Sequence, residues 1–110
     1  EACNMEIATE TTEGAEIVRV SEDVKGLDAL RLSKTLGGLK DSPTRRVILD
    51  LSAVRFIDSN GLGGLIASYH LLKKHEKELV LAGPREQVKR LFRDVSFEKV
   101  FTLIDPPRSR

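Results

Sequence analysis

Residues 47–65 decide the fold of this chain and read VILDLSAVRFIDSNGLGGL. Residues 47–51 are almost continuously apolar and rich in β-branched side chains, which predicts a strand covered on both faces. Asp58, Ser59 and Asn60 are all good helix N-caps. After them an apolar stripe recurs at helical spacing, formed by Leu62, Leu65, Ile66, Tyr69 and Leu72. The segment therefore predicts a buried strand that leads through a loop into an amphipathic helix beginning near Asn60.

Ser59 lies at the expected start of this helix. The first turn of a helix has unpaired backbone N–H groups and the positive end of the macrodipole, so a phosphate there is favoured by about 0.3–1 kcal/mol at an exposed site. Asp-Ser-Asn-Gly also occurs in many loops, in which the serine is only a cap or turn residue. Position alone leaves open both a phosphorylation switch and a purely structural serine.

The order of the whole segment resembles the signature of the STAS family, which bacterial anti-sigma-factor antagonists typify. The apolar strand is followed by Leu-Ser-Ala-Val, Phe-Ile and Asp-Ser-Asn-Gly-Leu-Gly, and then by the amphipathic helix. In that family the motif reads Asp-Ser-Ser or Asp-Ser-Thr before Gly-Leu-Gly, and a partner kinase phosphorylates the serine directly after the aspartate. Ser59 holds that position, so the resemblance implies that Ser59 is the phosphorylation site.

The resemblance covers residues 6–104, including a second family-like stretch at 88–97, and the chain departs from the family pattern in two places. The family usually carries Gly-x-Leu/Ile-Asp after its second strand, but Glu22 stands at the glycine and Lys25 at the aspartate. The contacts that the family makes through that aspartate do not carry over to Lys25. Asn60 stands where a second Ser or Thr is common, so it offers no alternative hydroxyl for phosphate.

The function implied by the resemblance is antagonism of an anti-sigma factor. In the family scheme, the unphosphorylated protein binds an anti-sigma factor that is also its serine kinase, which releases a sigma factor for transcription. Phosphorylation of Ser59 would end the binding, and a phosphatase is a possible further partner. We expect the contact surface to consist of the helix start and the loop after the second strand, with Asp58, Ser59, Asn60, Gly61, Leu62, Glu22 and Asp23.

Gly61 and Gly63 are expected to matter at this surface for a steric reason. Without a Cβ atom they would let the backbone of a partner approach closely. A bulky residue at Gly61 is therefore expected to weaken partner binding and to leave thermal stability nearly unchanged.

Two other functions stay open: an accessory subunit of a membrane transporter for lipids or anions, and a domain that binds a small molecule or nucleotide.

Catalysis is disfavoured. The glycines after Asn60 lack a following Gly-Lys-Ser/Thr, and Ile66 stands where a dinucleotide fingerprint needs Gly or Ala. His70 is about 16 Å along the helix from Ser59 at 1.5 Å per residue, too far to act as its base. His70 and His75 diverge around the helix, so we expect a binding module without a metal or cofactor.

Composition supports a protein-binding module. A chain of 110 residues makes one domain, and 18 Lys and Arg against 17 Asp and Glu argue against a nucleic-acid binder. Cys3 is the single cysteine, so no internal disulfide can form and a reducing compartment is expected. The chain has no apolar run of transmembrane length and no signal-peptide pattern at residues 1–4, which predicts a cytoplasmic protein without direct membrane insertion.

The remaining elements are read from periodicity and turn residues. A hairpin is expected first, with its turn at Glu13 and Gly14, and a third helix after Pro84 is expected to bury Val88, Leu91, Phe92 and Val95. The strands are expected at 5–11, 15–20, 47–51, 78–82 and 100–104, and the first helix at 27–40.

The fold class is therefore α/β, and alternating strands and helices imply right-handed crossovers between parallel strands. By resemblance to the STAS family we expect a mixed sheet of four or five strands with the helices packed mainly on one face. The STAS-like domain is expected to span residues 5–105, with a flexible extension at 1–4 and a tail at 106–110.

Overall fold

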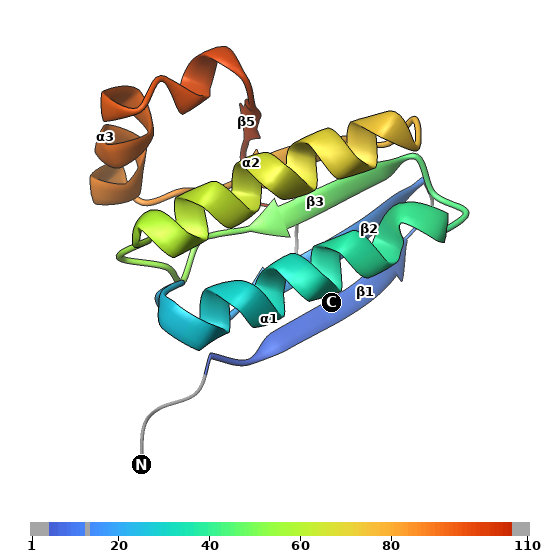
Figure 1. The fold of residues 1–110 in the computed structure, drawn as a ribbon, viewed down its shortest axis with the longest axis horizontal. Helices are drawn as coiled ribbons and strands as arrows, with labels where there is room; N and C mark the ends of the chain where they lie inside the picture. Colours follow the sequence, from blue (N-terminus) through green and yellow to red (C-terminus); the bar gives the residue numbers. More distant parts are fainter. Residues whose placement is uncertain (1–4, 13, 107–110) are drawn as a thin grey trace.

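The computed structural model of the chain describes residues 5–12 and 14–106. It contains one five-stranded sheet in the order β1-β2-β3-β4-β5 (Figure 1). The strands are β1 (Ile7–Thr12), β2 (Ala15–Val20), β3 (Arg46–Asp50), β4 (Glu78–Ala82) and β5 (Thr102–Ile104). The helices are α1 (Gly26–Gly37), α2 (Ser59–Lys74) and α3 (Glu86–Asp94), with short 3-10 helices η1 (Gly38–Asp41) and η2 (Phe97–Lys99).

The sheet is mixed. β1 pairs antiparallel with β2, and all later pairs are parallel, with one helix in each crossover. Figure 1 shows α1 and α2 side by side on one face of the sheet, as expected. Because β2 and β3 are parallel, their carboxyl ends meet at one edge, and the loops that lead into α1 and α2 start there.

The main core lies between the sheet and the helices. Leu49, in the central strand β3, is fully buried, which confirms the predicted covered strand. The buried cluster that contains Leu49 also has members from all three helices, among them Leu32, Leu65 and Phe92. The opposite face of the sheet carries a smaller buried cluster formed by Ala15, Ile17, Ile48 and Ala82.

Some element ends and the burial of one side chain differ from the sequence prediction. The first helix ends at Gly37 and continues only as the 3-10 turn η1, because two glycines weaken the last turn. The predicted burial of Val95 is wrong: Val95 is the C-cap of α3, with φ −107°, so it leaves the helical stripe and is 41% exposed. The last strand begins at Thr102 instead of Val100, because the chain turns through η2 and inserts Phe101 into the core.

Some sequence predictions fall on parts of the chain outside the described residues. These are the extension at 1–4, Glu13 and most of the tail at 106–110, so the predicted domain limits stay predictions. Gly14 is described and adopts φ +85°, the left-handed region that a tight turn uses. Within the described ranges, no helix has the length and apolarity needed to span a bilayer.

Candidate functional site

The candidate site is built from two loops, residues 21–25 after β2 and 51–58 after β3, which run side by side. Val24 and Ile57 form a parallel bridge. The N–H of Val24 donates to the carbonyl of Phe56 at 3.0 Å, and the N–H of Asp58 donates to the carbonyl of Val24 at 3.1 Å. A short ladder therefore fixes the loop before α1 against the loop before α2.

Asp23 adds a second link between the loops. Its Oδ1 atom accepts hydrogen bonds from the N–H groups of Arg55 and Phe56, at 2.8 and 3.1 Å. The carboxylate of Asp23 is thus already used inside the molecule. Glu22 lines a polar hollow with Asp23, Arg55 and Arg85. Of these two predicted contact residues, Asp23 has a structural role, and Glu22 is partly exposed.

Asp58 joins the starts of the two helices. It is the N-cap of α2, where its Oδ1 accepts from the N–H of Gly61 at 2.8 Å. Its Oδ2 accepts from the N–H of Gly26, the first residue of α1, at 2.9 Å. Burial of the carboxyl opposes ionisation, but hydrogen bonds from Gly26, Gly61 and Asn60 outweigh it and lower the pKa of Asp58. The carboxylate is therefore charged at neutral pH.

Ser59 is the first residue of α2, which confirms that a helix begins next to Asn60. Ser59 and Asn60 are both exposed, whereas Leu62, three residues on, is half-buried and packs against the core. Asp58 already occupies the N–H group of Gly61 in the first turn. A group attached to the hydroxyl of Ser59 would therefore project to the surface, with one of the nearest helix N–H donors already engaged.

Gly61 corrects one expectation from the sequence. It is buried, and a Cβ atom there would lie 2.5 Å from Ile57 Cγ2 and 3.0 Å from the carbonyl oxygen of Val24. The close approach is therefore made by the chain's own loop, so the expectation that a bulky residue at Gly61 leaves stability unchanged is wrong. Gly63 is exposed, and a Cβ atom there would meet nothing within 4 Å.

Exposed apolar side chains, which were not predicted from the sequence, flank the site. Leu27, Leu30 and Phe56 are 79%, 53% and 50% exposed. Leu27 and Leu30 line a hollow between α1 and α2 that also includes Asn60. The signal for them is present in the sequence, because both leucines fall outside the stripe formed by Ala29, Leu32 and Leu36.

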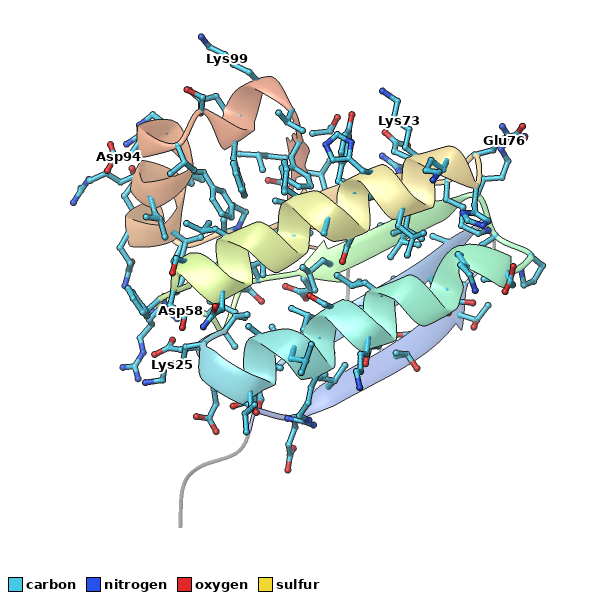
Figure 2. All side chains as sticks on the ribbon, viewed as in Figure 1. Lys25, Asp58, Lys73, Glu76, Asp94 and Lys99 are labelled. Carbon is cyan, nitrogen blue, oxygen red and sulfur yellow. The ribbon has the colours of Figure 1, made fainter. Side chains whose placement is uncertain are left out.

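Lys25 is the N-cap of α1 and makes no side-chain capping hydrogen bond. Figure 2 shows Lys25 and Asp58 at the end of the molecule where α1 and α2 begin. A cation at a helix N-terminus is unfavourable, and capping normally needs a side-chain oxygen. The carboxylate of Asp58 supplies that oxygen to Gly26 from across the site.

Comparison with known proteins identifies relatives of this arrangement. The family model described as "STAS domain" matches residues 6–108. The "Anti-sigma-B factor antagonist" of Staphylococcus aureus is 28% identical over 89 residues, which are 81% of this chain and 82% of that protein. A solved structure of an anti-sigma factor antagonist from Mycobacterium paratuberculosis has 26% identity and a TM-score of 0.81, and the match covers 92% of this chain and 86% of that chain. A Thermotoga maritima structure described as such an antagonist shares the fold, with a TM-score of 0.82 at 18% identity over 90% of this chain and 86% of that chain.

Proposed function

Because the chain belongs to the STAS domain family, we propose that it is an anti-sigma-factor antagonist with Ser59 as its phosphorylation switch. The observation that carries this proposal is the position of Ser59: it is exposed, and the residue before it bonds to the starts of both helices. The site is therefore held in place before any partner arrives. A preformed surface binds without the entropic cost of ordering its loops.

In the proposed mechanism, the unphosphorylated protein binds an anti-sigma factor that is also its serine kinase, and thereby frees a sigma factor. Phosphorylation adds a charge of about −1.5 to −2 within the contact surface. Because Asp58 already engages the N–H group of Gly61, that donor is not free to bind the phosphate. The added charge would remain at the surface, where it repels a facing carboxylate or loses its hydration, and the partner dissociates.

The kinase would supply ATP and magnesium, and the chain itself would bind without a cofactor. The seven predicted contact residues have different roles in this proposal. Ser59, Asn60 and Glu22 would touch the partner, because they are at least partly exposed. Asp58, Asp23 and Gly61 would hold the loops in shape, because their groups already make contacts within the chain. Leu62 is half-buried and would anchor α2 to the core.

The test is phosphorylation by a purified anti-sigma factor kinase from the native organism. We expect one phosphate, which peptide mass spectrometry places on Ser59 and not on Ser52, Ser68 or Ser96. Ser59→Ala should abolish it and keep partner binding, whereas Ser96→Ala, at another exposed serine, should change neither. Failure of every such kinase to label or bind the chain would overturn the proposal. Capture of a membrane-transporter subunit instead would support the accessory-subunit function.

A further inference from the structure

We propose that the hollow between α1 and α2 is a docking groove for an apolar segment of the anti-sigma factor that carries acidic side chains, a proposal that rests on the proposed function. The groove holds about 530 Å³. It is lined by Gly26, Leu27, Ala29, Leu30, Ser33, Asn60 and Gly64, and no lining residue is charged.

The apolar character of the groove comes from α1, which has a second stripe besides its buried one. Leu27 and Leu30 are three residues apart and therefore lie on one side of the helix. They are the two most exposed large apolar side chains of the described residues, at 79% and 53%. Isolated exposed leucines are common, but two adjacent ones beside a hollow indicate a surface that a partner covers.

The depth of the groove depends on how closely α1 and α2 approach. A Cβ atom at Gly64 would lie 2.3 Å from Ser33 Oγ, so a side chain there would displace the Ser33 hydroxyl and fill part of the groove. Asn60, which follows Ser59, lines the same groove. The groove therefore extends to the start of α2, and a segment seated in it would lie beside the residue that follows Ser59.

Two lysines beside the groove favour an acidic occupant, because the carboxylate of Asp58 next to it already accepts the N–H groups of Gly26 and Gly61. Lys25 precedes the groove-lining residues of α1, and Lys34 lies one turn beyond Leu30. Asp28, the nearby acidic residue of α1, is paired with Arg31 at 2.9 Å. No ion pair is found for Lys25 or Lys34 among residues 5–12 and 14–106. Carboxylates on the occupant would pair with these two lysines, and phosphate on Ser59 would repel the carboxylate at the Lys25 end of the groove.

The experiment compares matched pairs of variants of the full chain in calorimetric titrations with the purified anti-sigma factor. Leu27→Ser with Leu30→Ser should weaken binding at least tenfold. Val95→Ser with Val100→Ser, which changes exposed apolar residues elsewhere, should leave binding within twofold. Lys34→Glu should weaken binding about threefold or more at low salt and less at high salt, whereas Lys99→Glu should not. Unchanged thermal melting of each variant checks that it remains folded.

If the parent chain binds the anti-sigma factor and the leucine double variant binds it with the same affinity, the groove is not the docking site. The proposed function is unaffected by that result.

If the parent chain binds no anti-sigma factor, the proposed function fails, and a second measurement tests whether the groove binds an acidic apolar segment. The amide NMR shifts of the chain are then measured in two titrations. One adds an amphipathic leucine peptide with flanking glutamates, and the other adds the same peptide with lysines in place of the glutamates. Shifts at Leu30 and Gly64 with the acidic peptide alone support the groove, and any other pattern overturns it. Sedimentation that shows dimers in the parent chain and monomers in the leucine variant would also overturn it, because the occupant is then a second copy.

Discussion

The carboxylate of Asp58 accepts a hydrogen bond of 2.9 Å from the backbone N–H of Gly26, although 32 residues separate them in the chain. The same carboxylate caps α2 through Gly61. The first N–H of α1 is therefore satisfied by the residue next to Ser59, and not by its own N-cap, Lys25. One side chain thus couples the starts of two helices and the position of the proposed switch.

The first prediction tests this coupling by Asp58→Ala. The change leaves the N–H groups of Gly26 and Gly61 without their acceptor, so we expect the free energy of unfolding to fall by about 1–3 kcal/mol. Urea unfolding measures it. Asp94→Ala, at an exposed aspartate in the last turn of α3, is the control and should cost less than about 0.5 kcal/mol. Equal effects of the two changes would contradict the coupling.

The second prediction concerns pH. The pKa of Asp58 is lowered in the folded chain because the carboxylate accepts several N–H hydrogen bonds that outweigh its burial. A lowered folded pKa contributes stability that is present above the unfolded pKa, about 3.9, and is lost as pH falls through the folded value. The stability difference between the wild type and Asp58→Asn should therefore be constant from about pH 5 to 7 and shrink below about pH 4. A difference that grows on acidification would refute this assignment.

The third prediction compares two glycines of α2. Gly61→Ala should destabilise the protein by about 1–3 kcal/mol, because the new methyl group collides with Ile57 and the carbonyl of Val24. Gly63→Ala should stabilise it by about 0.5–1 kcal/mol, because its Cβ meets open space and alanine favours a helix interior. Thermal melting of both variants gives the signs. The same sign for both would show that Gly61 is not packed as described.

The fourth prediction concerns the core. Leu49→Ala removes a fully buried side chain from the central strand and should cost about 2–5 kcal/mol in urea unfolding. Leu27→Ala, at a leucine that is 79% exposed, should change stability by less than about 0.5 kcal/mol. A loss at Leu49 as small as that at Leu27 would be incompatible with the central position of β3.

Periodicity was sufficient to predict the elements around the site. The apolar run at 47–51 and the capping residues after Ile57 predicted β3 and the start of α2, because both signals depend on neighbours in the sequence. The hydrogen bonds that Gly26 donates to Asp58 and that Arg55 donates to Asp23 join loops more than 30 residues apart, so no local pattern could reveal them. The burial of Gly61 followed from the same loop contact and was missed for the same reason.

The exposed stripe of α1 was missed because one helix carries two apolar faces. Ala29, Leu32 and Leu36 satisfied the expected buried stripe, and Leu27 and Leu30 then remained without a role. Val95 shows the opposite error, since it fits the stripe of α3 in the sequence but lies at the C-cap, where the helical period ends. The spacing of apolar residues predicts burial only inside a helix, and tertiary structure determines where the helix ends.

Calorimetric titration of one anti-sigma factor with two forms of the chain, unphosphorylated and phosphorylated on Ser59, tests directly whether Ser59 is the switch. Ser59→Ala serves as the control that lacks the hydroxyl and adds no charge. We expect phosphorylation to weaken binding at least tenfold, about 1.4 kcal/mol, and Ser59→Ala to bind like the unphosphorylated chain. Equal affinity of the phosphorylated and unphosphorylated forms would contradict Ser59 as the switch.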